Sequence, residues 1–93
     1  MVEYAFPRHV LAVARVSGQL DTEGSLARFG SAVRETRLAR GVSQEALADA
    51  AGIDRSHMGK VERGQMNITL LNIARIAKAL DCKLSELLGA AGL

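Results

Sequence analysis

Metal and disulfide chemistry find little support in this sequence, which has one cysteine and two histidines in 93 residues. A lone Cys82 excludes an internal disulfide and a zinc site built on several cysteines, because both need further thiols. His9 and His57 stand 48 positions apart, which is not a metal-ligand spacing. Cys82 is interpreted as a small buried apolar side chain beside Leu80 and Leu84. The sequence predicts no metal and no cofactor.

Aromatic residues, proline and long apolar runs are also scarce. One proline and three aromatics, in a chain that is 48% hydrophobic and rich in Ala and Leu, favour small packed helices over a β-sandwich. No stretch approaches the roughly 18 apolar residues of a membrane span. The start MVEYAFPRHVLAVARVSG lacks the basic residues and long apolar run of a signal peptide, so we expect a cytoplasmic protein.

Residues 1–25 are interpreted as an N-terminal extension or arm, followed by a domain at 26–93. Pro7 predicts the first position of a helix that would stop at Gly18. Alternating apolar residues in the same stretch equally favour a strand or an extended arm. The polar segment SGQLDTEGS (17–25) has two glycines and reads as a linker.

From residue 26 onward, apolar spacing and capping residues predict five helices joined by short connections. Ser43 and Asp54 are expected N-caps, and Gly52 is an expected left-handed helix stop. The expected helices cover residues 26–40, 43–51, 54–64, a densely apolar stretch that begins after Thr69, and 84–88, the last ending before Gly89. The predicted fold class is a compact all-α domain.

The window SQEALADAAGIDRSHMGKVERG (43–64) carries the functional signal. Two short helices meet through a turn at Gly52, and Ala48 offers a small side chain where the helix axes would cross. This combination is typical of a helix-turn-helix, although an ordinary helical hairpin uses the same devices. The apolar seam between the two helices is expected to comprise Leu47, Ala51, Ile53, Met58 and Val61.

The second helix of this window has two unlike sides when it is projected at about 100° per residue. Met58 and Val61 fall on the apolar side. The opposite side has three cations and a hydroxyl around Gly59, which costs a helix about 1 kcal/mol relative to alanine. A merely solvated face gives no reason for that glycine. We interpret Gly59 as a gap that lets the helix sit deep in a DNA major groove.

This window, together with ITLLNIARIAKALDCKLSELLG, resembles the phage-repressor family of helix-turn-helix proteins (lambda repressor and Cro-like, Xre-type). The resemblance covers about residues 26–89 and implies a five-helix lambda-repressor-like domain whose recognition helix, 54–63, enters the major groove. It implies base contacts from Arg55, Ser56 and Lys60. It implies contacts to the DNA backbone from Gln44, Gln65 and Asn67, and from His57, for which simple packing is an equal alternative. Arg63, on the same cationic face, is expected to contact the backbone too.

The resemblance also implies a structural ion pair between Arg37 and Glu62. The residues support this pair independently, because Arg37 lies in the apolar stripe of its helix, where an unpaired cation would be costly. Glu62 borders the buried side of the recognition helix. One departure from the family is Lys83, which stands where a capping serine is frequent.

Two functions from different classes remain open. The first is a sequence-specific regulator that binds double-stranded DNA as a homodimer, since one recognition helix reads only a few base pairs. The second is a protein-interaction module of the antitoxin or anti-repressor type, with residues 1–25 docking on a protein partner. Restriction–modification controllers, prophage repressors and toxin–antitoxin regulators look alike at this level. Apolar surface for the dimer is expected among Leu84, Leu87, Leu88 and Leu93, although the first three could instead face their own core. The N-terminal segment is an alternative source of the dimer contact.

No enzyme function is expected. The sequence has no paired carboxylates, phosphate-binding glycine loop or metal cluster. Ser56 and His57 are adjacent on a helix, so their side chains diverge by about 100° and cannot form a nucleophile–base pair.

Overall fold

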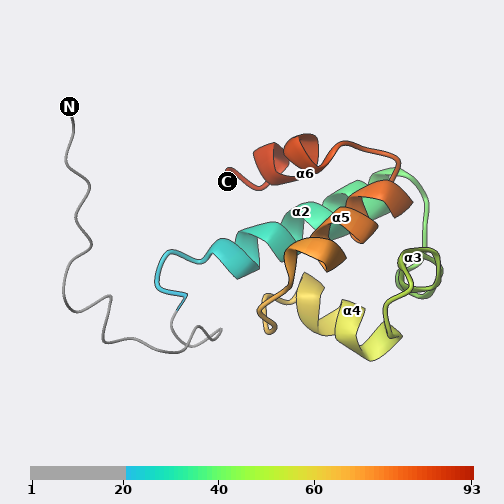
Figure 1. Cartoon of the computed structure of the whole chain (residues 1–93), viewed down its shortest axis with the longest axis horizontal. Coiled ribbons are helices and arrows are strands. Elements are labelled where there is room, and N and C mark those ends of the chain that lie inside the picture. Colours follow the sequence, from blue (N-terminus) through green and yellow to red (C-terminus); the bar gives the residue numbers. More distant parts are fainter. Residues whose placement is uncertain (1–20) are drawn as a thin grey trace.

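The computed structural model describes residues 21–93, which form five helices and no strand (Figure 1). Both interpretations of the segment from Pro7 to Gly18 fall outside the described residues. The helices are α2 (Ser25–Ala39), α3 (Gln44–Ala51), α4 (Arg55–Glu62), α5 (Leu70–Ala79) and α6 (Leu84–Ala90). The all-α prediction is confirmed.

The helices begin where short polar side chains can accept their free N–H groups. Ser43 Oγ accepts from the backbone N–H of Ala46 at 3.0 Å, and Thr69 Oγ1 accepts from Asn72 at 3.2 Å. Asp54 caps α4 by accepting from the backbone N–H of Ser56 at 3.1 Å. The expected N-caps are therefore present.

Two helix starts use a different device. Asp21, inside the stretch interpreted as a linker, accepts from the backbone N–H groups of Ser25 at 2.9 Å and Leu26 at 2.7 Å. This carboxylate fixes the first turn of α2. At α6, Lys83 has no capping side chain, but its own backbone N–H donates to Glu86 Oε1 at 2.9 Å. The missing serine is thus replaced by half of a capping box.

The end of α6 differs from the sequence expectation. Gly89 does not stop the helix, which continues to Ala90, and the left-handed residue is Gly92 at φ 74°. A glycine inside a helix costs only about 1 kcal/mol, so a hydrogen-bonded last turn outweighs it.

The core lies where α2 meets α4 and α6, and where α5 meets α3 and α6. In Figure 1, α4 and α6 lie on opposite sides of α2. The side chains below 2% exposure are Leu47, Met58, Ile76, Leu80, Leu87, Val33 and Val61. Every predicted seam residue of the helix-turn-helix is buried, which confirms the predicted pairing of the two helices.

Cys82 is half-buried and packs against this core. Burial raises the pKa of its thiol above the ordinary value. Both observations fit the apolar role expected from the sequence, since a raised pKa disfavours the reactive thiolate.

Candidate nucleic-acid interface

The turn between α3 and α4 sets the angle at which α4 is presented. Gly52 adopts φ 67°, which side-chain-bearing residues rarely tolerate, and the next N–H, of Ile53, donates to Ala48 O at 2.9 Å. Asp54 then caps α4 directly. The chain therefore turns within three residues, α4 packs against α3, and Ala48 of α3 is buried.

The two sides of α4 are separated as the helical projection predicted. Met58 is fully buried at 0% exposure and Val61 is at 2%. The outward side has four exposed side chains around a shallow hollow that Gln44 of α3 and Gly59 also line: Arg55, Ser56, Lys60 and Arg63. The surface of the helix-turn-helix is therefore cationic at its centre.

Gly59 lies beneath the ends of two polar side chains. It is buried, and a Cβ placed there would lie 3.0 Å from Nη1 of Arg63 and 3.4 Å from Oε1 of Gln44. The side chain of Arg63 is held by a hydrogen bond from its Nε to Gln65 Oε1 at 2.9 Å. The space over Gly59 thus holds the chain's own guanidinium and amide groups, and the interpretation of Gly59 as a notch for DNA stays a prediction.

A buried ion pair lies beneath this surface. Arg37 of α2 donates from Nε to Glu62 Oε2 at 2.8 Å and from Nη2 to Oε1 at 3.0 Å, with side chains 9% and 3% exposed. Its third nitrogen donates to Val42 O at 3.0 Å. The hydrogen bond with Glu62 raises the pKa of Arg37 against the opposing effect of burial. The structure thus contains the pair that the sequence indicated.

Gln44 connects this pair to the cationic surface. Its amide Nε2 donates to Glu62 Oε1 at 3.1 Å, so one carboxylate holds groups from α2 and α3 against α4. The second amide proton is left for another acceptor. The network fixes a donor at the first residue of α3, beside the cations of α4.

A helix-turn-helix family model matches residues 33–87, more than half of the chain. The chain belongs to the Xre-type helix-turn-helix family.

Relatives with this helix-turn-helix domain include control proteins and a restriction–modification controller. The control protein C.SmaI of Serratia marcescens is 41% identical over 61 residues, which are 66% of this chain and 73% of that protein. C.BamHI of Bacillus amyloliquefaciens is 41% identical over 61 residues, 64% of this chain and 75% of its own. The crystal structure of the controller C.AhdI from Aeromonas hydrophila superposes with a TM-score of 0.68 and 52% identity, covering 69% of this chain and 97% of that one.

Helix-turn-helix proteins of this family are DNA-binding transcription regulators and not enzymes, as expected for this chain. Among residues 21–93, no helix combines the length and the apolar content that crossing a membrane requires.

The remaining site residues of the helix-turn-helix domain are placed as follows. Ser56 donates its hydroxyl proton to the carboxylate of Asp54, and this bond is the main cause of the lowered pKa of Asp54. Its oxygen stays exposed as an acceptor. His57 is half-buried, and its Nε2 is buried without a hydrogen-bond partner in the described part of the chain. That placement favours packing over DNA contact. Gln65 and Asn67 are exposed on the loop after α4.

Sequence reasoning missed Glu45. Its carboxylate Oε2 lies 4.0 Å from Nη1 of Arg55, and the two side chains are 74% and 68% exposed. Ten positions separate these residues, so no helical periodicity relates them. Only the tight turn at Gly52 brings the starts of the two helices together, so the turn was the only sequence feature that could have indicated this ion pair.

Proposed function

We propose that the protein is a sequence-specific transcription regulator that inserts α4 into the major groove of double-stranded DNA. The observation that carries this proposal is the outward cationic side of α4 on a buried helix-turn-helix seam. The eight residues of α4 span about 12 Å, a length that the major groove admits. The side chain of Arg55, at the first position of the helix, is 68% exposed and long enough to reach a base edge.

The proposed contacts divide into base-reading and backbone-binding residues. Arg55 and Lys60 offer donors to guanine, and the exposed oxygen of Ser56 accepts from an amino group of adenine or cytosine. Gln44 donates its remaining amide proton to a phosphate. The other proposed backbone contacts are Arg63, Gln65 and Asn67, whereas for His57, with its buried Nε2, we propose the packing role.

The biological role follows from the relatives. C.SmaI and C.BamHI are control proteins and C.AhdI is a restriction–modification controller, and we extend the role of C.AhdI to this chain in preference to a prophage repressor. The antitoxin alternative places its docking segment at residues 1–25, of which 1–20 lie outside the described residues, so it stays a prediction.

The proposal is tested by selecting duplexes from a random pool, then measuring the affinity for the selected site. Arg55→Ala should cost about 1–3 kcal/mol of discrimination at one base pair and leave the others unchanged. About six phosphate contacts per dimer give a log–log salt slope of roughly −5. If no sequence is enriched from the random pool, or if Arg55→Ala keeps the base preference of the wild type, the proposed docking is contradicted.

We also propose a homodimer, with a different surface from the one expected. Of the leucines expected there, Leu87 is buried at 1% exposure, Leu84 and Leu88 pack partly against the core, and Leu93 is exposed at 49%. Large exposed leucines lie instead at the start of α5, Leu70 at 70% and Leu71 at 61%. Exposed apolar residues that adjoin one another favour an interaction site.

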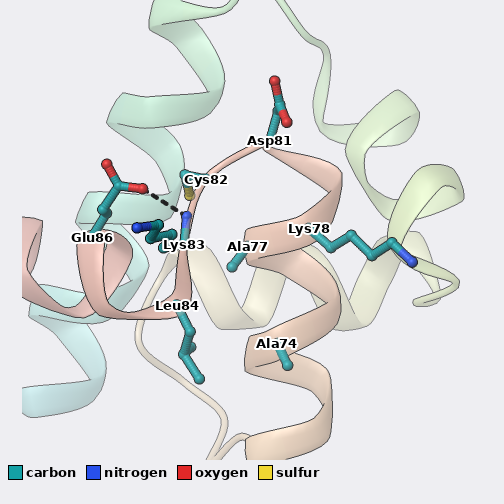
Figure 2. A pocket seen from close by; sticks show the side chains of 8 residues that line it. All are labelled: Ala74, Ala77, Lys78, Asp81, Cys82, Lys83, Leu84 and Glu86. Atoms are coloured by element: carbon teal, nitrogen blue, oxygen red, sulfur yellow. Dashed lines mark hydrogen bonds between the residues drawn. The ribbon is translucent and has the colours of Figure 1, made fainter.

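A hollow between α5 and α6 continues this apolar surface. Ala74, one turn after Leu70 and Leu71, lines it together with Leu84 (Figure 2). Its rim has two cations, Lys78 and Lys83, and two acids, Asp81 and Glu86. Charges of both signs suit a contact in which the same surface meets its own copy.

The dimer is tested by sedimentation. Replacing Leu70 and Leu71 with glutamate should give a folded monomer. Leu38→Glu, at a leucine 55% exposed on α2, is the matched control and should stay dimeric. A dimeric Leu70/Leu71 variant, or a monomeric control, contradicts the proposed surface.

A further inference from the structure

We infer that Glu45 is a specificity-determining residue that positions Arg55 for reading a guanine. The inference rests on the proposed DNA-binding function. It starts from the 4.0 Å separation between Glu45 Oε2 and Arg55 Nη1 at the DNA-facing ends of two helices.

The two residues are fixed by rigid neighbours. Glu45 lies in the first turn of α3, where the helix dipole favours an acidic side chain. Arg55 is the first residue of α4, directly after the Asp54 cap. Their backbones are therefore held by the tight turn, while their side chains project into solvent. A carboxylate at this place restricts the directions that the long Arg55 side chain samples.

Arg55 has enough N–H donors to bind Glu45 and a guanine at the same time. A guanidinium has five N–H donors in a planar fork, and a bidentate bond to O6 and N7 of guanine uses two of them. With Nη1 facing Glu45, the edge formed by Nε and Nη2 remains for the base. Glu45 accepts from one side while guanine accepts from the other. No other base edge in the major groove offers two acceptors in this arrangement.

The same carboxylate weakens binding to arbitrary DNA. Non-specific affinity comes from cations on phosphates, and a negative charge beside Arg55 opposes it. To reach a phosphate away from a guanine, Arg55 has to turn away from Glu45. Glu45 thus favours the complex with the specific site and disfavours complexes with arbitrary DNA. Both effects raise the ratio of specific to non-specific affinity.

The experiment compares dissociation constants for the selected site and for a scrambled duplex at one salt concentration. Glu45→Gln should lower the specificity ratio about two- to fivefold, the range that an exposed ion pair allows. Its melting temperature should equal that of the wild type, since both side chains are exposed. If Glu45 had a purely structural role, Glu45→Gln would change the melting temperature and leave the specificity ratio unchanged.

Asp49→Asn is the matched control. Asp49 lies one turn further along α3 and lines a different hollow, beside Arg75 and Lys78. This variant removes the same charge from the same helix and should keep the ratio. In an Arg55→Ala background, Glu45→Gln should have no effect on the ratio.

The outcomes separate this inference from the proposed function. If the wild type selects no sequence, the DNA-reading proposal itself fails. If the wild type selects a site and Glu45→Gln discriminates equally well, only the role of Glu45 is overturned. An equal loss in Asp49→Asn, or in the Arg55→Ala background, also overturns it, because the effect would then be general electrostatics.

Discussion

Truncating Glu62 should be among the most damaging single changes in this domain. Glu62→Ala removes the acceptor of two Arg37 bonds, at 2.8 and 3.0 Å, and of one Gln44 bond at 3.1 Å. The Arg37 side chain, 9% exposed, would keep its charge and lose its counter-ion. Such a truncation costs about 3–5 kcal/mol. A domain of this size has about 4–11 kcal/mol of total stability, so the loss is a large share of it.

The assay is urea unfolding followed by circular dichroism, with thermal melting as a second measure. At about 4–8 °C per kcal/mol, Glu62→Ala should lower the melting temperature by more than about 12 °C. Glu35→Ala, at an exposed acid on α2, is the control and should melt close to the wild type.

A double variant separates the lost pair from lost packing. Arg37→Met with Glu62→Leu removes both charges and should recover much of the stability, because the penalty comes from the unpaired cation. A Glu62→Ala protein that unfolds at the wild-type urea concentration would refute the account of a buried, mutually dependent pair.

Three further changes test other parts of the domain. Gly59→Ala should leave the melting temperature unchanged or raise it slightly, because a helix favours alanine over glycine by up to about 1 kcal/mol. The displaced Arg63 side chain should weaken DNA affinity. Unchanged affinity would contradict the position of the Arg63 side chain over Gly59. Gly30→Ala should destabilise the fold by about 1–3 kcal/mol in urea unfolding, because its Cβ would lie 2.5 Å from the carbonyl oxygen of Glu62; a neutral variant would mean that α2 and α4 separate easily. Because the pKa of Asp54 is lowered in the folded state, the stabilising contribution of its carboxylate is present above the ordinary pKa of 3.8 and is lost as the pH falls through the lower folded-state pKa. Asp54→Asn should therefore flatten this part of the curve of stability against pH. An unchanged curve would show that other groups cause the acid sensitivity.

Local features of the fold were predictable because they depend on neighbouring residues. Ser43, Asp54 and Thr69 each cap the helix that follows within three residues, so their roles can be inferred without tertiary structure. The seam between α3 and α4 follows from apolar periodicity in the same way. Arg37 and Glu62 are 25 positions apart, and their pairing was accessible through the family resemblance and through the cost of burying a lone charge.

Features that depend on side chains meeting across helices were not predictable. The path of Arg63 over Gly59 depends on the side-chain directions of Arg63 and Gln44, which helical projection does not give. Leu70 and Leu71 are exposed although they begin a densely apolar stretch, because apolar content does not reveal which element covers a helix face. Glu45 and Arg55 approach each other only through the angle of the turn.

The inward and outward sides of α4 have different roles, and this difference affects how such a regulator can acquire new targets. The inward residues Met58, Val61 and Glu62 hold the helix in place, while Arg55, Ser56 and Lys60 project into solvent. Substitutions at exposed positions usually change folding free energy by no more than about 0.5 kcal/mol. On the proposed docking, substitutions on the outward side of α4 can therefore change the operator preference while the inward side keeps the fold intact.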